Sequence, residues 1–451
     1  MCKVTFAFMI GLIKGLQLLL SLSILVVLHE FGHYWAARYF KTRVEKFYLF
    51  MDAFNFSLFK KKIGETEWGI GWLPLGGYVK ISGMIDESMD TEQMKQPAQP
   101  HEFRSKPAWQ RLIIMLGGII VNLIVGFIIY TMVLMVWGET VLPNNYTVNV
   151  NESIEKYGLQ SGDKIIKYND VELEYYSDLR RIPFSEQVMS ATVIRNGSEH
   201  VVEFETELGQ IMIDEGVRAP FGLQFPSQID SIIPGSRAEA AGLQAGDKLQ
   251  LIDGQIASSQ IQARRALGAK KSSPVLLEVL RGEELLTVPA MTDTAGALGF
   301  YFVANAEQMH LFPQEKIDYG VADAITEGFA IAGRTIKDYA TSLRFLATKS
   351  GASQVGSLIT FGSIFDGTWN WHVFWKNTAF LSLILAFMNL LPIPALDGGH
   401  VMFLIYEMIT GKPAPDRVLE IAQLIGIVFL LGLMVFALGN DFWRLFNGGF
   451  G

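Results

Sequence analysis

Residues 18–33 read LLLSLSILVVLHEFGH, an apolar run that leads directly into a cluster of histidine and glutamate. The apolar run begins near Thr5 and contains one charged residue, Lys14. About 20 apolar residues in an α-helix cover the roughly 30 Å hydrocarbon core of a bilayer. No small-residue cleavage site follows the run, which argues against a secretory signal peptide. The stretch from about residue 5 to 28 is therefore a predicted membrane span with an ionisable motif at its end.

The ionisable motif is His29-Glu30-Phe31-Gly32-His33, the H-E-x-x-H pattern. Residues four apart on an α-helix differ by about 40° in azimuth and about 6 Å along the axis, so both imidazoles can converge on one ion. Zinc suits two imidazole ligands, and Glu30 is then placed to take a proton from the attacking water. The alternative is that the three side chains are interfacial polar residues at the end of a span. Ionisable groups near bilayer depth cost roughly 2.5 kcal/mol or more, which favours the metal site.

A catalytic zinc site needs a third protein ligand. We expect it in the segment NLLPIPALDGGH, residues 389–400, where two prolines stop a helix and two glycines permit a tight turn. Asp397 is the preferred candidate because a carboxylate completes a His₂-acid site. Two alternatives remain, namely His400 as the ligand and Asp397 as a simple helix N-cap.

Three further apolar stretches are predicted spans, at about residues 112–137, 373–391 and 421–438. Half of the residues are hydrophobic and 18% are charged, which is typical of a membrane protein with several parts. A net charge of -8 gives no basic field for nucleic acid. The single cysteine, Cys2, excludes an intramolecular disulfide. The chain is thus expected to be a polytopic α-helical membrane protein with about four spans.

The orientation of the spans follows from the basic residues beside them, which are retained in the cytoplasm. Twelve Lys and Arg lie between the first and second spans, against Lys3 and Lys14 on the amino-terminal side. The loop between these spans is therefore predicted to be cytoplasmic. The segment of about 235 residues between the second and third spans, and both termini, are predicted to be extracytoplasmic.

This long segment contains an internal repeat, GLQSGDK at 158–164 and GLQAGDK at 242–248, 84 residues apart. Each copy continues with a strand, a turn, a polar helical stretch and a hairpin, at Asn196-Gly197 or Arg281-Gly282. Each closes on a Gly-Phe element, with Gly222 and Phe225 in the first copy and Gly299 and Phe300 in the second. The pattern resembles two PDZ domains in circular permutation, which would bind a peptide by strand addition. Spacer modules with unused grooves are the alternative.

Between the first two spans, residues 44–82 alternate apolar and polar side chains, with glycine and proline breaks that include Gly76 and Gly77. This pattern predicts short antiparallel strands. A hairpin close to a bilayer must hide its edge, pair it, or use it to capture another chain.

Taken together, these motifs resemble the site-2 protease family of intramembrane metalloproteases, and most closely its regulator-of-sigma-E protease branch with two tandem PDZ domains. The motifs that carry the resemblance are HEFGH at 29–33, PLGGYVK at 74–80, GGIIVN at 117–122, the paired repeats, and NLLPIPALDGGH at 389–400. One departure is Val355-Gly356-Ser357, where relatives often have Gly-Pro.

The resemblance implies a role for each matching residue. His29, His33 and Asp397 would bind zinc, and Glu30 would act as general base and acid. Asn389 would hold substrate or the transition state. The strands near Gly76 and Gly77 would form a membrane-reentrant β-loop that pairs with an unwound substrate helix.

The expected function is that of an intramembrane zinc metalloprotease of the bacterial inner membrane, acting in regulated intramembrane proteolysis. Its expected partners are lipid and single-span membrane substrates, such as anti-sigma factors or signal-peptide remnants, and no nucleic acid. The PDZ pair would admit only substrates already trimmed by another protease. A non-catalytic PDZ-bearing membrane receptor is the main alternative, and a zinc transporter would need more polar groups in its spans.

The predicted organisation has seven parts. They are 1–40, first span with the zinc motif; 41–111, β-loop and cytoplasmic loop; 112–140, second span; 141–226 and 227–309, the two PDZ domains; 310–372, an amphipathic linker; and 373–451, third and fourth spans with the third ligand. In the linker, residues 322–349 are expected to form an amphipathic helix on the outer membrane face or to pack on the second PDZ domain.

Overall fold

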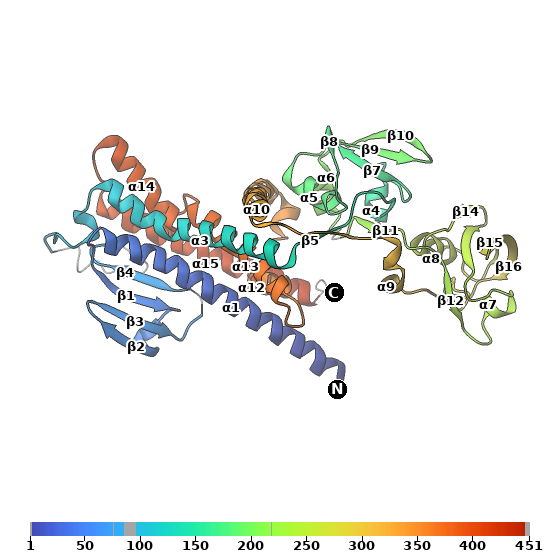
Figure 1. The fold of residues 1–451 in the computed structure, drawn as a ribbon, viewed down its shortest axis with the longest axis horizontal. Coiled ribbons are helices and arrows are strands. Elements are labelled where there is room, and N and C mark those ends of the chain that lie inside the picture. The colour runs from blue at the N-terminus through green and yellow to red at the C-terminus, as the bar shows by residue number, and fades with distance from the viewer. Residues whose placement is uncertain (1, 75, 85–95, 218, 447–451) are drawn as a thin grey trace. The chain divides into compact units, whose positions relative to one another are not determined.

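The computed structural model describes residues 2–74, 76–84, 96–217 and 219–446. The chain forms two compact units (Figure 1). Unit 1 contains residues 1–138 and 318–451, and unit 2 contains Glu139–Ile317. The two segments of unit 1 are far apart in the sequence, but they fold into one compact unit. The HEFGH motif and the Asp397 segment therefore belong to the same unit.

Within the described residues, unit 1 has four helices that are long and apolar enough to cross a membrane. They are α1 (Cys2–Tyr39), α3 (Ala108–Trp137), α13 (Trp371–Leu390) and α15 (Asp416–Phe446). Each corresponds to one of the four predicted spans. Their length and composition confirm the expected spans, but α1 continues through the HEFGH motif to Tyr39, so the motif lies inside a helix rather than at its end.

The contact between α1 and α3 depends on glycine. A Cβ at Gly32 would lie 2.3 Å from the carbonyl oxygen of Gly117, and a Cβ at Gly117 would lie 2.5 Å from the carbonyl oxygen of Gly32. No side chain fits between the two backbones at this point, as at other small-residue helix crossings in membranes. The crossing brings the backbone of α3 against the turn of α1 that carries the motif.

A mixed four-stranded sheet lies along α1 (Figure 1). Its strands are β1 (Val44–Leu49), β2 (Ser57–Ile63), β3 (Thr66–Gly71) and β4 (Tyr78–Ile81), in the order β2-β3-β1-β4. The expectation of purely antiparallel strands is wrong, because β1 and β3 pair in parallel, with Phe47 opposite Trp68. The β2-β3 hairpin folds back on one side of β1, and the following segment carries β4 to the other side. The most buried strand, β1, thereby becomes internal.

The rest of unit 1 packs around these spans. Helix α10 (Val321–Ser342) is formed by part of the predicted linker. Its buried side packs on α3 and α13 through Ile331, Ala332 and Ile336. This buried face is therefore used for packing within unit 1. The other α-helices among the described residues of unit 1 are α11 (Lys349–Ala352), α12 (Leu358–Ser363) and α14 (Asp397–Thr410).

Unit 2 contains two hydrophobic cores, one formed by residues between Val148 and Phe221 and the other by residues between Ile229 and Leu298. The elements of the first repeat are β6 (Val148–Val150), α4 (Glu152–Glu155), β7 (Lys164–Tyr168), β8 (Val171–Glu172), α5 (Asp178–Ser185), β9 (Ser190–Arg195), β10 (Ser198–Glu203), α6 (Leu208–Asp214) and β11 (Phe221–Leu223). Those of the second are β12 (Ile229–Ile232), α7 (Arg237–Ala240), β13 (Lys248–Ile252), β14 (Gln255–Ile256), α8 (Gln260–Gly268), β15 (Pro274–Arg281), β16 (Glu284–Met291) and β17 (Phe300–Phe302).

The repeated sequence is also a repeated topology. The larger sheets have the orders β10-β9-β7-β8 and β16-β15-β13-β14, and each repeat ends with a strand that returns to pair with its first strand, β11 with β6 and β17 with β12. Each GDK turn is fixed in the same way. The buried carboxylates of Asp163 and Asp247 accept two hydrogen bonds each from Arg195 and Arg281, at 2.7–2.8 Å.

The chain enters and leaves unit 2 through a two-stranded ribbon. Strand β5 (Glu139–Val141) pairs antiparallel with β18 (Glu315–Ile317). The short helix α9 (Asn305–Gln308) precedes β18 in the chain. Residues 310–317, which we assigned to the linker, therefore belong to unit 2, because their strand completes this ribbon.

Candidate active site

Helix α1 holds both histidines of the motif one turn apart and buried, with 8% and 5% of His29 and His33 exposed. Their Nε2 atoms lie 3.2 Å from each other. The helical spacing thus brings the two imidazoles to one point, as the sequence pattern predicts.

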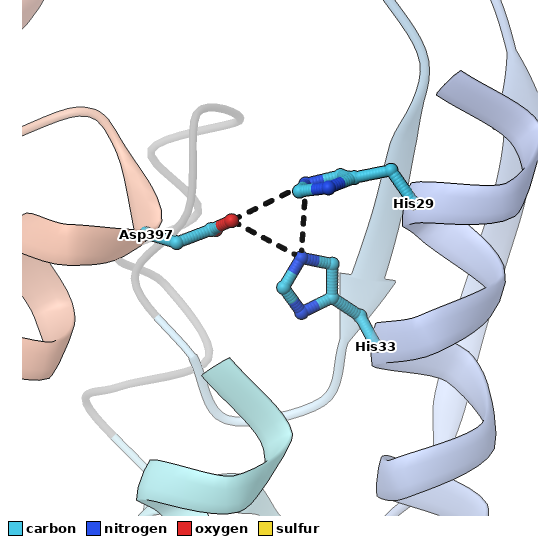
Figure 2. A group of neighbouring side chains, drawn as sticks. All are labelled: His29, His33 and Asp397. Carbon is cyan, nitrogen blue, oxygen red and sulfur yellow. Dashed lines mark hydrogen bonds and ion pairs between the residues drawn. The ribbon is translucent and has the colours of Figure 1, made fainter. Parts of the chain in front are cut away.

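Asp397 reaches the same point from the carboxyl-terminal part of the chain. Its Oδ2 lies 3.2 Å from Nε2 of His29 and 3.3 Å from Nε2 of His33 (Figure 2). The residue is the first of α14, and Leu396 occupies the N-cap position. The alternative of Asp397 as a simple N-cap is therefore not what the structure contains.

The proline- and glycine-rich segment explains how Asp397 reaches the histidines. Ala395 has a φ of 77°, in the left-handed region, so the chain turns sharply just before the aspartate. A Cβ at Gly398 would lie 2.2 Å from the carbonyl oxygen of Leu391, and one at Gly426 of α15 would lie 1.8 Å from that of Pro394. The segment is packed too tightly at both places for any side chain.

His29, His33 and Asp397 fit a zinc ion by their chemistry. Their ligand atoms all lie within 4.8 Å of one another. Nδ1 of His33 lies 2.8 Å from the carbonyl oxygen of Ile114, which can only accept, so Nδ1 carries a proton and the neutral imidazole offers its lone pair at Nε2. Among the described groups, no well-aligned donor satisfies the buried Oδ2 of Asp397, in spite of the short distances. Two imidazoles and a carboxylate are the donor set of catalytic zinc sites.

Glu30 and Asn389 line the same cavity, which has a volume of about 750 Å³. The backbone N–H of Val79 in β4 hydrogen-bonds to Glu30. The Nδ2 atom of Asn389, in the last turn of α13, lies 3.4 Å from Nε2 of His29. A carboxylate and an amide therefore stand beside the three ligand candidates.

Gly76, Gly77 and His400 also line the cavity. A Cβ at Gly77 would lie 2.7 Å from Val26 and 3.4 Å from Glu30, so the chain before β4 passes directly over α1. His400, the alternative ligand, is outside the three-residue group found among the described residues.

The other predicted binding residues lie in unit 2. Gly222 is in β11, and the ring of Phe225 meets that of Phe312, with centroids 5.2 Å apart. Gly299 has a φ of 91° and leads into β17, where Phe300 is the first residue. Their roles as peptide-binding residues stay a prediction.

Sequence reasoning gave no site role to several residues of the cavity wall. Asp52 accepts hydrogen bonds from Tyr78 at 2.7 Å and Lys46 at 3.0 Å, and all three line the cavity. Gln423 of α15 accepts from the backbone N–H of Ala395 at 3.2 Å. The positions of Asp52 and Lys46 depend on the sheet register, and that of Gln423 depends on the last span. Of these wall residues, only Tyr78 lies in a local motif, PLGGYVK at 74–80.

The fold and this site define a class of protein, namely a metal-dependent hydrolase whose active-site helix is itself a membrane span. The chain belongs to peptidase family M50, whose sequence profile matches residues 17–433.

Relatives match over nearly the whole chain. The regulator of sigma-E protease RseP of Escherichia coli K12 is 28% identical over 95% of this chain and 98% of its own. Protease RseP of Yersinia pestis has the same identity and coverage. A predicted zinc metalloprotease of Xylella fastidiosa strain 9a5c is 30% identical over 94% of this chain and 97% of its own. These matches confirm the expected family and branch, and with them an intramembrane zinc metalloprotease.

The close approach of α3 predicts that Gly118→Ala weakens metal binding. A Cβ at Gly118 would lie 2.4 Å from Nε2 of His33 and 2.6 Å from Cε1 of His29, so it would displace both rings. We expect zinc affinity, measured by competition with a chelator, to fall by about tenfold or more. The control is Gly15→Ala on α1, where the added methyl meets nothing within 4 Å. Parental zinc affinity in Gly118→Ala would contradict the arrangement.

Proposed function

We propose that this protein cleaves transmembrane segments of single-span substrates at the site formed by His29, Glu30, His33 and Asp397. The observation that carries the proposal is the convergence of two helix-borne imidazoles and Asp397 on one buried point beside Glu30. Family membership supports hydrolysis of peptide bonds. The burial of the site between apolar helices supports a substrate that is itself in the membrane.

Each residue has a distinct role. His29, His33 and Asp397 hold zinc, which when bound supplies Lewis-acid catalysis for peptide hydrolysis. Glu30 removes the proton from the attacking water and returns it to the leaving amine. Asn389 donates a hydrogen bond to the substrate backbone or to the developing oxyanion, since its amide faces the same cavity.

Strand β4 presents the substrate. A transmembrane helix resists hydrolysis because its carbonyls are hydrogen-bonded, so the scissile segment must be unwound. In the order β2-β3-β1-β4, β4 is the terminal strand of the described sheet, and its Val79 faces Glu30. An extended substrate that adds to this strand passes the general base. A Cβ at Gly76 would meet no described atom within 4 Å, whereas Gly77 packs against α1, so the open side for a second backbone is at Gly76.

Unit 2 is the selectivity element, formed by two circularly permuted PDZ domains. The strands β11 and β17 carry Gly222 and Phe300, and each pairs along one edge within the described sheets. The basic loop between α1 and α3 supports a cytoplasmic position for the sheet and an extracytoplasmic one for unit 2, in a bacterial inner membrane. Anti-sigma factors and signal-peptide remnants are the substrate classes that fit, the first suggested by the names of relatives.

The division of roles predicts different outcomes for two variants. Glu30→Gln retains the metal ligands, so it should bind zinc like the parent but lose cleavage of a model single-span substrate by a factor of about 10² or more. Asp397→Ala removes a ligand and should lose both zinc and cleavage. Zinc content and cleavage are measured on the same detergent-purified samples.

Cleavage by Glu30→Gln at the parental rate would contradict this function. A parent protein without zinc or cleavage would instead indicate the non-catalytic receptor.

The gating role of unit 2 predicts that its removal relaxes selectivity. Because Val141 and Glu315 are paired neighbours, residues 142–314 can be replaced by a two-residue Asn-Gly turn that keeps the β5-β18 ribbon. The shortened protein should cleave a substrate with its full extracytoplasmic domain about as fast as the trimmed substrate. Continued discrimination against the untrimmed substrate would show that selectivity resides in unit 1.

A further inference from the structure

Asn122 of α3 is fully buried beside the proposed metal site. Its Nδ2 atom lies 3.2 Å from Nδ1 of His29, and its Oδ1 is buried without a hydrogen-bond partner among the described groups. Its backbone carbonyl accepts a hydrogen bond of 2.7 Å from the hydroxyl of Ser382 on α13. The residue is thus held from one side and contacts a ligand candidate on the other.

The two histidines have matching surroundings on α3. His33 donates its Nδ1–H to the carbonyl of Ile114, which leaves Nε2 free to bind a metal. His29 meets α3 through the same ring nitrogen, but there the partner is a side-chain amide, whose nitrogen and oxygen have nearly the same shape. The tautomer of His29 therefore depends on which amide atom faces it.

The two amide orientations have opposite consequences. If the amide nitrogen donates to Nδ1, the neutral imidazole carries its proton on Nε2, the atom that faces His33 and Asp397. That tautomer has no lone pair for a metal at this position. If the amide oxygen accepts from Nδ1–H, Nε2 is free. Either orientation leaves one end of the amide unpaired among the described groups, so hydrogen bonding alone does not favour one of them. A bound metal favours the orientation that leaves Nε2 of His29 with a lone pair.

We propose that Asn122 is a positioning residue whose side-chain oxygen accepts a hydrogen bond from Nδ1–H of His29 and so directs the Nε2 lone pair to the metal. Ile114 and Asn122 then act as a pair of acceptors on one helix, one for each histidine. The glycine crossing at Gly117 and Gly118 brings α3 close enough for both contacts. This inference rests on the proposed role of His29 as a zinc ligand.

The test compares two variants of the full-length protein in detergent. Asn122→Leu is close in volume but cannot accept, and its zinc affinity should fall by about 10- to 100-fold. Asn122→Asp keeps an acceptor and lacks a donor when ionised, so it should retain the parental affinity. Loss of affinity in Asn122→Asp equal to that in Asn122→Leu, or parental affinity in Asn122→Leu, would overturn the inference.

The matched control is Thr378→Val. Thr378 is also fully buried between spans and hydrogen-bonds to Ser21 at 3.0 Å, away from the histidines. This variant should keep the parental zinc affinity. Reduced affinity here, equal to that of Asn122→Leu, would show that any lost interhelical hydrogen bond weakens the site, and would overturn a specific role for Asn122.

A second measurement on the parent does not depend on the variants folding. In zinc-loaded protein labelled with ¹⁵N-histidine, His29 should carry its proton on Nδ1, as His33 does. A proton on Nε2 of His29 would overturn the inference. The variant His29→Ala distinguishes failure of the proposed function from failure of this inference. Parental zinc affinity in His29→Ala would refute the proposed function itself. Reduced zinc affinity in His29→Ala but not in Asn122→Leu would refute only the role of Asn122.

Discussion

Three lone-pair donors from opposite ends of the chain meet at one buried point, and much of unit 1 is organised around that meeting. Two imidazoles and a carboxylate within 3.3 Å of one another in an apolar helix bundle form a compact donor set that a bound cation would stabilise. The glycine crossing of α1 and α3 and the turn before Asp397 are the structural requirements of that convergence. A side chain at Gly32, Gly117 or Gly398 would collide with backbone.

The second constraint is the nature of the substrate. A peptide bond inside a membrane helix is shielded from water and already hydrogen-bonded, so a metal and a base are not sufficient. In the proposed mechanism, the sheet along α1 offers the substrate backbone alternative hydrogen bonds, because its terminal strand β4 borders the cavity with Glu30. Binding energy from strand addition can then offset the cost of unwinding the substrate.

The sequence predicted the four spans and the convergence of His29 and His33. Both depend on local features, namely apolar length for the spans and a one-turn spacing for the two histidines. Asp397 was accessible through its unusual chemistry in a proline-broken segment. The parallel pairing of β1 with β3 was not, because alternation of side chains determines which residues face inward but not which strands are neighbours. Asn122 ends the GGIIVN motif, but the sequence does not show that it faces His29, since that contact forms only where α3 crosses α1. The positions of Asp52 and Gln423 in the wall of the active-site cavity likewise depend on tertiary packing.

The most direct test of the account is anomalous diffraction at the zinc absorption edge from crystals of the zinc-loaded protein. We predict a single anomalous peak in unit 1, within about 2.0–2.2 Å of Nε2 of His29, Nε2 of His33 and a carboxylate oxygen of Asp397. A peak ligated by His400 in place of Asp397, or zinc bound away from α1, would contradict it.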